Sequence, residues 1–530
     1  MSPIEEMQAR YGASYKWLAT GTVMLGTIVV TVAATIVNVA LNDIMGTFGM
    51  SQDQVQWLST GFLAAMTATM LLTAWQLDRF GHRTTYIFAL TLFIIGSVLG
   101  AVSHSSGEVI LARVLQGLAA GMIQPMAMVI ISIVFPYDKR GTAMGIYGMG
   151  VVLAPALGPT LGGVMVDEYS WRDVFLVVLP ICAVAISAAA VFLPGRDPHI
   201  VERKRFDVIG FALLSVALVT LLYGLSNGQR LGWHSNEILL SFAFAVLSSL
   251  GFIIWELISP NALLNMRVFT SIRFSASCVV AFALGAGIYG STYIIPLFVQ
   301  TIQGYTPTRS GLLLMPAGLI LLFIFPVAGR ISDRVPARIP ISAGLALFGF
   351  SFWLAKAMDV NTPFWTLALW VVLGRIGLGF ILPALNAGAL RALPDSQIAQ
   401  GSGSVNFVRQ LGGAFGVNLL AIFVERRTTF HGDALAQTIT AANPAAAETL
   451  RRLNGMLAHW GNPFGDRFPQ HLHPAALSFL EAEVIPKAQM FAYQDGFYIV
   501  AILFFLAVIP AWLMNDNPHS RYRPRFEPAR

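Results

Sequence analysis

Charged residues are scarce in this chain of 530 residues. They make up 11% of the sequence, whereas hydrophobic residues make up 56%. Because a soluble domain carries about 25% charged residues, this composition excludes a large soluble enzyme and indicates an integral membrane protein embedded in a lipid bilayer. The net charge of +6 is not evidence for a nucleic-acid partner, since the basic residues lie in short segments between apolar runs.

Cysteine and the motifs of several enzyme classes are also scarce or missing. Cys182 and Cys278 both lie inside apolar runs, so no disulfide is expected. There is no GxxxxGKS or GxxxxGKT motif and no soluble segment large enough to hydrolyse ATP. The apolar runs hold no nucleophile–base or metal-ligand set, and His471 and His473 have no obvious third ligand. We therefore expect no enzyme activity, no metal and no cofactor, and transport that is passive or driven by an ion gradient.

Long apolar runs dominate what remains, and fourteen of them can cross about 30 Å of hydrocarbon. They lie at about 17–41, 55–77, 84–103, 108–135, 143–166, 171–193, 207–226, 236–258, 274–299, 310–328, 338–358, 364–390, 399–424 and 491–514. The first is too long for a cleavable signal peptide and is expected to be a membrane helix. The sequence therefore predicts an all-α polytopic membrane protein.

Lys and Arg are distributed unevenly among the connections. If the N-terminus is inside, the inner segments hold twenty of them, and the short outer loops hold only Arg172, Arg230 and Arg309. Cytoplasmic loops carry the excess of basic residues in membrane proteins. Both termini are therefore expected to be cytoplasmic.

The chain also repeats itself. The tripeptide Leu77–Arg79 after the second run matches Ser332–Arg334 after the tenth, and Arg113 in the fourth run has a counterpart in Arg375 in the twelfth. Two repeated halves around a central site are typical of transporters. The expected organisation is a tail at 1–16, a six-helix bundle at 17–193, a basic loop at 194–206, two extra helices at 207–258, a second six-helix bundle at 259–514 with an outer loop at 425–490, and a tail at 515–530.

One apolar run is unusually rich in small residues and proline. Gly150, Ala154, Gly158 and Gly162 recur at every fourth position, and Pro155 and Pro159 lie beside them. Small residues let a second helix approach to backbone contact, and proline is tolerated in a membrane helix where neighbours satisfy the freed carbonyls. Two interpretations stay open: a tight helix crossing, or a bending helix at the seam of a protein with two conformations.

Basic residues inside apolar runs are costly and are functional candidates by default. Arg113, Gln116 and Gln124 lie on one side of their helix. This polar stripe either faces a cavity or holds an arginine that pins carbonyls of neighbouring helices. Thr31, Thr35 and Asn38 form a second stripe, which either binds substrate or forms hydrogen bonds between helices. The candidates for a substrate cavity are Thr31, Thr35, Asn38, Gln124, Arg375 and Arg409.

A charged turn follows the second run and is repeated in the second half. A carboxylate in such a turn can cap a helix N-terminus and pair with an arginine across the seam between two bundles, a contact that breaks when the bundles rock. A solvated turn with positive-inside charge is the alternative. The candidates for this cytoplasmic gate are Asp78, Arg79, Gly81, Arg83, Asp333 and Arg334.

These motifs together resemble the major facilitator superfamily, and within it the fourteen-span drug:proton antiporters of the EmrB/QacA type. The segment from Arg113 to Gly117, which includes Gln116, resembles the family's fourth-span motif, whose arginine is implicated in proton coupling. The turn of Asp78 and Gly81 resembles the loop motif that gates the cytoplasmic side. The residues that resemble the antiporter motif of the fifth span are Gly150, Pro155, Gly158, Pro159, Gly162 and Gly163. The resemblance implies two six-helix bundles with two extra transmembrane helices between them in the chain.

One departure concerns the proton site. The family usually carries an aspartate two residues before Thr35, where this chain has Ala33, and no predicted span holds a carboxylate near its middle. Glu108 and Asp53, which lie near span ends, are therefore retained with Arg113 as candidates for proton coupling.

The resemblance implies a secondary exporter of small amphipathic or toxic compounds in the bacterial inner membrane, working by alternating access and proton antiport. It also implies a possible handover of substrate to a periplasmic adaptor and a TolC-type outer-membrane channel. A metabolite importer or uniporter of the same superfamily is the first alternative, favoured by the missing carboxylate. A non-transporting receptor or scaffold is the second, although buried arginines are hard to explain in a scaffold.

Overall fold

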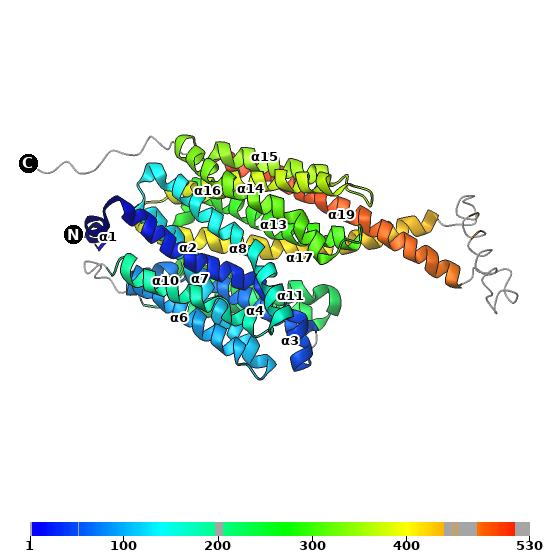
Figure 1. Cartoon of the computed structure of the whole chain (residues 1–530), viewed down its shortest axis with the longest axis horizontal. Helices are drawn as coiled ribbons and strands as arrows, with labels where there is room; N and C mark the ends of the chain where they lie inside the picture. The colour runs from blue at the N-terminus through cyan, green and yellow to red at the C-terminus, as the bar shows by residue number, and fades with distance from the viewer. Residues whose placement is uncertain are drawn as a thin grey trace, which may run out of the picture.

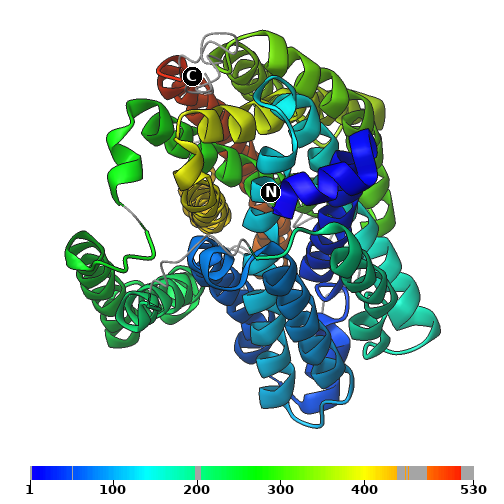
Figure 2. The same ribbon diagram turned by 90° about the vertical axis from the view of Figure 1, so that its left-hand side faces the viewer.

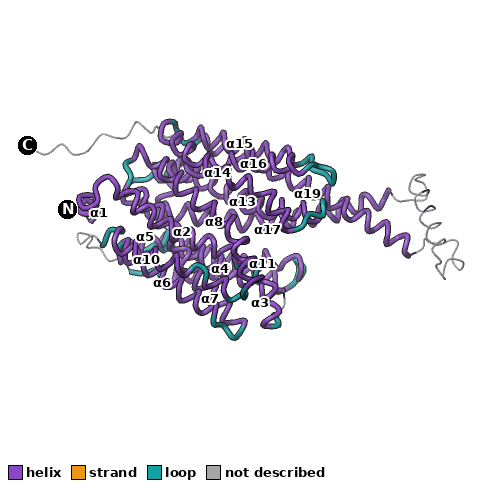
Figure 3. Tube along the Cα trace, in the orientation of Figure 1, coloured by secondary structure: helices purple, strands orange, loops and turns teal. Residues whose placement is uncertain are grey.

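The fold is built entirely from helices in the part of the chain that the structure describes. The computed structural model describes residues 3–50, 52–196, 205–264, 266–438, 448, 452 and 474–514, and the trace in Figure 3 shows no strand among them. Twelve helices of this part are long and apolar enough to cross a membrane, or thirteen if the bent pair α4–α5 is one span. The chain is therefore an all-α, multi-pass membrane protein, as predicted.

Each of the fourteen predicted apolar runs falls on one of the long helices or bent helix pairs. Their bounds are α2 Tyr15–Ile36, α4 Gln52–Met70 with α5 Thr73–Phe80, α6 His82–Ala101, α7 Ser106–Val134, α8 Arg140–Glu168, α9 Asp173–Leu176 with α10 Leu179–Phe192, α11 Val208–Leu231, α12 Asn236–Ile258, α13 Ile272–Thr301, α14 Pro307–Arg334, α15 Arg338–Ala355, α16 Phe364–Arg391, α17 Ile398–Thr438 and α19 Pro474–Trp512. Two short helices, α1 (Pro3–Tyr11) and α3 (Leu41–Phe48), flank α2.

Several helix starts are fixed by a side chain one residue before the helix. Ser105, Ser235, Ser271 and Thr306 precede α7, α12, α13 and α14, and each accepts a hydrogen bond from the backbone N–H three residues on. The first four N–H groups of a helix lack intrahelical partners, so these hydroxyls stabilise the helix ends. Polar residues at these positions therefore determine where the apolar runs become helical.

The buried hydrophobic residues form two large clusters and a small one. One large cluster is drawn almost entirely from residues between Met7 and Leu193, and the other from residues between Val268 and Met514. We call the helices that carry them the first bundle (α2–α10) and the second bundle (α13–α19). In Figure 1 the first bundle lies in the lower part of the molecule and the second in the upper part.

The helices α11 and α12 are central in the sequence but lie at the edge of the molecule (Figure 2). Leu214 and Leu218 of α11 and Phe252 of α12 form the small cluster with residues at the end of α4. Trp57 of α4 also stacks on Tyr223 of α11, with ring centroids 6.0 Å apart. This hairpin therefore packs on the outside of the first bundle.

The predicted outer loop at 425–490 is helical at both of its ends. α17 continues to Thr438 and α19 begins at Pro474, so the two helices extend beyond the other helices at one end (Figure 1). Asp495 joins them, because its Oδ2 accepts a bond of 2.6 Å from Arg427 Nε and lies 2.8 Å from His431 Nε2. His471 and His473 lie outside the described residues.

The first helix α1 and the end of α19 lie at the same end of the molecule (Figure 1). We call this the terminal end, and the end with the α17 and α19 extensions the far end. The charge distribution predicts that the terminal end is cytoplasmic, and this orientation stays a prediction.

Candidate functional site

Arg113 is the most deeply buried cation in the described part of the chain, with 1% of its surface exposed. Its Nε donates to the carbonyl of Leu58 in α4 at 3.0 Å. Its NH1 donates to the carbonyl of Ala33 in α2 at 3.2 Å and to Gln116 Oε1 at 2.8 Å. Ala33 lies in the last turn of α2, where carbonyls lack intrahelical partners and the helix dipole is negative. The guanidinium therefore donates hydrogen bonds to backbone carbonyls of two helices, α2 and α4, at once.

The network continues from Arg113 into the rest of the first bundle. Gln116 Nε2 donates to Ser97 Oγ of α6 at 2.8 Å, and the guanidinium carbon of Arg113 lies 4.2 Å from the ring centroid of Phe62. Four helices, α2, α4, α6 and α7, thus meet at one cation. Within the described residues no carboxylate forms an ion pair with Arg113, which instead donates to the backbone oxygen of Ala33, the residue at the sequence position of the family's usual aspartate.

The two carboxylates predicted for proton coupling are not part of this network as described. Glu108 is exposed in the first turn of α7, where its Oε2 accepts a 2.7 Å bond from the backbone N–H of His104. Asp53 belongs to the first turn of α4, and its side chain lies outside the described set. Of the predicted proton-coupling residues whose side chains are described, Arg113 and Gln116 are buried and Glu108 is exposed.

The small residues of α8 pack against α2. A β-carbon on Gly158 would lie 2.0 Å from Thr35 Oγ1 and 3.2 Å from the carbonyl oxygen of Val32, and one on Gly162 would lie 2.9 Å from the carbonyl oxygen of Ile36. On Gly150 it would lie 3.1 Å from the terminal methyl of Met24, whereas Gly163 has open space. This face is a tight crossing within the first bundle. The backbone at Pro155 and Pro159 is part of the same helix.

A second glycine face of α8 packs against α14 of the second bundle. A β-carbon on Gly145 would lie 2.4 Å from the carbonyl oxygen of Phe325, and one on Gly329 would lie 2.5 Å from the carbonyl oxygen of Gly141. At such distances only glycine permits the backbones to approach. α8 therefore contacts its own bundle with one face and the other bundle with another.

The contact between α8 and α14 ends in a polar cluster at the terminal end. Asp333 Oδ1 accepts a 2.6 Å bond from Gly141 N, and its Oδ2 accepts bonds from Thr142 N at 2.8 Å and Thr142 Oγ1 at 2.6 Å. Arg391 of α16 donates to Asp333 Oδ1 at 3.1 Å and to the Ser332 carbonyl at 3.0 Å. A carboxylate at a helix N-terminus is stabilised by the free N–H groups and the dipole. We call Asp333, Gly141, Thr142 and Arg391 the latch.

The matching turn of the first half contacts its own bundle. Arg83 donates from Nε to the carbonyl of Leu193 at 2.9 Å and from its backbone N–H to the carbonyl of Pro194 at 3.1 Å. Gly81 has a φ of +77°, and a β-carbon there would lie 2.7 Å from the α-carbon of Arg196. Asp78 and Arg79 are half-buried in α5, and Arg334 is exposed. The repeated motif therefore has different surroundings in the two halves.

A second seam joins α7 to α17. Ser402 Oγ donates to the carbonyl of Pro125 at 2.8 Å, and Asn406 Nδ2 lies 2.8 Å from Met128 Sδ. Arg409 NH2 donates to Asn406 Oδ1 at 2.5 Å. The predicted cavity residue Arg409 is thus held by a residue that itself contacts the first bundle.

The other predicted cavity residues do not gather in one cluster. Thr31 and Thr35 donate to carbonyls of their own helix. The Asn38 side chain is exposed and accepts a 3.2 Å bond from Ser59 Oγ. Gln124 is buried, and its backbone carbonyl accepts a 3.5 Å bond from the hydroxyl of Tyr147 in α8.

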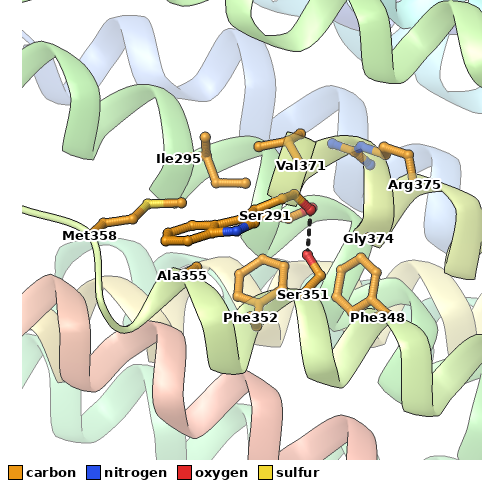
Figure 4. Close-up of a pocket in the computed structure, with 11 residues that line it drawn as sticks. Ser291, Ile295, Phe348, Ser351, Phe352, Ala355, Met358, Val371, Gly374 and Arg375 are labelled. Atoms are coloured by element: carbon orange, nitrogen blue, oxygen red, sulfur yellow. Dashed lines mark hydrogen bonds between the residues drawn. The ribbon is translucent and has the colours of Figure 1, made fainter. Parts of the chain in front are cut away.

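Arg375 lies in the second bundle beside a small cavity between α13, α15 and α16 (Figure 4). Its NH2 donates to Thr292 Oγ1 at 3.4 Å, and Ser351 Oγ donates to the carbonyl of Trp370 at 2.7 Å in the same wall. Within the described residues Arg375 forms no ion pair. Despite its matching place in the repeat, Arg375 therefore lacks the carbonyl network of Arg113.

Several residues of these contacts were not among the predicted site residues, and Arg391, Asn406 and Tyr147 are three of them. Arg391 counted only as an inner basic residue, and Asn406 and Tyr147 stand in apolar runs with no charge to mark them. The one available signal was their polarity within a predicted span, which by itself does not separate a seam residue from a core residue.

Comparisons with known proteins agree with this architecture. The sequence profile described as Major Facilitator Superfamily matches residues 23–417. The chain is 30% identical to the multidrug export protein EmrB of Haemophilus influenzae over 440 residues, 82% of this chain and 86% of that one. It is 26% identical to the probable multidrug resistance protein EmrY of Escherichia coli over 501 residues, 94% of each chain.

Solved structures show the same fold at low sequence identity. The human organic anion transporter MFSD10 has a TM-score of 0.58 at 14% identity, covering 92% of this chain and 99% of that one. The proton:xylose symporter XylE has a TM-score of 0.59 at 13% identity, covering 95% and 96%. With its two bundles, its edge hairpin and a profile match over most of its length, this chain belongs to the Major Facilitator Superfamily, a family of transporters rather than enzymes.

Proposed function

We propose that the protein is a secondary active exporter of small amphipathic or toxic compounds in a bacterial inner membrane, with both termini in the cytoplasm. Relatives named as a multidrug export protein and a probable multidrug resistance protein match more than four fifths of the chain, which supports an exported substrate of this kind. The basic inner segments support the orientation.

The latch is the observation that supports a mechanism of alternating access. Asp333 of the second bundle accepts hydrogen bonds from Gly141 and Thr142 of the first bundle, beside a close glycine contact between the backbones of α8 and α14. The ion pair of Asp333 with Arg391 lies within the second bundle and holds this carboxylate in place. Such a polar contact can break and re-form as two rigid bundles rock. It closes the terminal end in this conformation, so substrate would be released at the far end.

Proton antiport is proposed for the coupling, with Arg113 and Gln116 as its buried members. The positive charge of Arg113 lowers the proton affinity of any acceptor beside it. Two backbone carbonyls and Gln116 already compensate part of that charge, which weakens this effect. The alternative of a uniporter is favoured by one observation, the backbone oxygen of Ala33 in place of a carboxylate.

A handover to a periplasmic adaptor and a TolC-type channel is proposed for the far end. The extended ends of α17 and α19, braced by Arg427 and His431 on Asp495, offer a rigid helical surface there. A helical surface of this kind suits an elongated partner.

Flux into and out of proteoliposomes tests the function. The purified protein is reconstituted and given pH gradients of both signs with a panel of amphipathic compounds of positive, neutral and negative charge. Counter-movement of substrate and protons is expected, and it should vanish when the gradient is collapsed with an ionophore. Flux that follows only the substrate gradient would replace the antiporter by the uniporter.

A further inference from the structure

Two buried carboxylates face each other at the terminal end of the edge hairpin. Asp207 immediately precedes α11 and is 5% exposed, and Glu256 lies in the last turn of α12 and is 4% exposed. Of the other carboxylates in the described residues, only Asp333 of the latch is also buried. Its oxygens have four donors, but the oxygens of the Asp207–Glu256 pair are only partly satisfied.

One oxygen of each carboxylate has a clear structural role. Asp207 Oδ1 accepts bonds from Gly210 N at 2.9 Å and from Trp255 Nε1 at 2.7 Å, so it caps α11. Glu256 Oε2 accepts a bond of 2.9 Å from Leu264 N, which fixes the segment after α12. These bonds fix the positions of both side chains.

The second oxygen of each carboxylate is buried and has no hydrogen-bond partner. These atoms are Asp207 Oδ2 and Glu256 Oε1. A β-carbon on Gly210 would lie 2.5 Å from the first and 2.7 Å from the second, so their separation is no greater than the sum of these distances. The two orphan oxygens therefore converge on one spot above Gly210.

Two ionised carboxylates at this separation repel each other strongly in a buried site. The repulsion is removed by a cation or by one proton shared between the pair. Within the described residues no group of three or more metal-ligating side chains is present. The basic residues of the adjoining described segments, Arg205 and Arg267, are exposed, and Asp78 and Arg79 of neighbouring α5 bring charges of both signs.

We infer that Asp207 and Glu256 bind one exchangeable proton between Oδ2 and Oε1. The proton joins the first residues of the hairpin to its last turn, from which Leu264 leads through residues 266–270 into α13, the first helix of the second bundle. Loss of the proton leaves two facing carboxylates that repel each other. This repulsion loosens the contact between the start of α11 and the end of α12. The site lies apart from Arg113 and does not depend on the proposed transport function.

Infrared difference spectroscopy of the whole protein in detergent tests the inference directly. At neutral pH we expect the C=O stretch of a protonated carboxyl group that shifts in deuterated water. Glu256→Gln and Asp207→Asn should each remove this band, because an amide then donates to the remaining carboxylate. The matched control is Glu237→Gln, which changes an exposed carboxylate at the other end of α12. Spectra of the parent and Glu256→Gln that are identical would overturn the inference.

Thermal unfolding against pH gives a second readout. A proton bound only in the folded state stabilises it at low pH, and this stability is lost as pH rises. The parent and Glu237→Gln should therefore lose stability more steeply than Glu256→Gln as the pH rises above about 4, the ordinary pKa of a carboxyl group in the unfolded chain. Equal slopes would contradict the shared proton. Stabilisation of the parent, but not of Glu256→Gln, by added magnesium or calcium would instead assign a cation and overturn the proposal.

Discussion

At the scale of single residues, the protein compensates a buried cation with dipoles. Arg113 contacts the carbonyls of Ala33 and Leu58 and the amide of Gln116. A guanidinium keeps its charge at any pH that the protein meets, and its planar fork can serve several acceptors at once. The missing aspartate at position 33 is therefore compatible with a stable arginine, because backbone carbonyls of α2 and α4 accept its hydrogen bonds.

Replacing this arginine should damage both packing and transport. Each hydrogen bond to a charged group contributes about 1.5–3 kcal/mol, so Arg113→Ala should cost about 3 kcal/mol of stability or more and abolish gradient-driven efflux. Arg113→Lys should recover part of the stability, since one ammonium cannot reach both carbonyls and Gln116 in the same geometry. Thermal unfolding and proteoliposome flux measure the two effects. Glu108→Gln, at the other predicted coupling residue of the same helix, should alter the pH dependence less severely; full pH-driven transport by Arg113→Ala would refute the assigned role.

At the scale of helices, α8 is a two-sided element. Gly158 and Gly162 fit it against α2, and Gly141 and Gly145 fit it against α14. The close packing fits the interpretation as a tight helix crossing, and the interpretation as a bending helix between two conformations stays a prediction. The regular face that the sequence shows is the crossing within the first bundle, and the seam uses glycines nearer the start of the helix.

Leucine on the packed face should separate α8 from α2. At Gly158 its β-carbon would meet Thr35 and the backbone of Val32, whereas at Gly163 it would meet nothing within 4 Å. Gly158→Leu is therefore expected to reach the membrane, lose about 1–3 kcal/mol of stability from overpacking and stop efflux, while Gly163→Leu behaves as the parent. Membrane expression and efflux of a fluorescent substrate in cells compare the two. Equal efflux by both variants would show that this crossing has little consequence for transport.

The helices were predictable because bilayer-length apolar runs carry their own signal. The extensions of α17 and α19 were not, because residues such as Arg427 and His431 make those ends look like a loop until Asp495 is brought beside them. Of the latch, only Asp333 was predicted, because the repeat marked it. Its partners Gly141 and Thr142 lie almost two hundred positions away in the sequence, and the packing of α8 on α14 brings them together. Contacts between distant helices depend on tertiary packing, which no local pattern encodes.

At the scale of the whole molecule, the first test is the direction of the chain in the membrane. Lys139, just before α8, and Asn236, at the start of α12, are both exposed and lie at opposite ends of the bundle. In a variant whose own cysteines are replaced by alanine, Asn236→Cys should react with an impermeant thiol reagent added outside intact cells, and Lys139→Cys should react only after lysis. The reverse pattern would place both termini outside.

The second test concerns the seam that holds this conformation. Asp333 bonds the N-terminus of α8 and pairs with Arg391, whose side chain is fully buried. Asp333→Asn removes the charge that the N-terminus of α8 stabilises across the seam, and its amide nitrogen cannot accept the bonds that Thr142 donates to Oδ2. The terminal end should therefore open more often.

Spin labels at Lys139→Cys and Arg330→Cys report this opening as a population of longer distances in pulsed electron resonance. Both positions are exposed, and they lie on either side of the seam. Arg334→Gln, an exposed change next to Asp333, is the matched control and should leave the distances unchanged. If Asp333→Asn kept the distribution of the parent, the glycine contact between α8 and α14 would hold the seam without the latch, and the gating role assigned to Asp333 would fail.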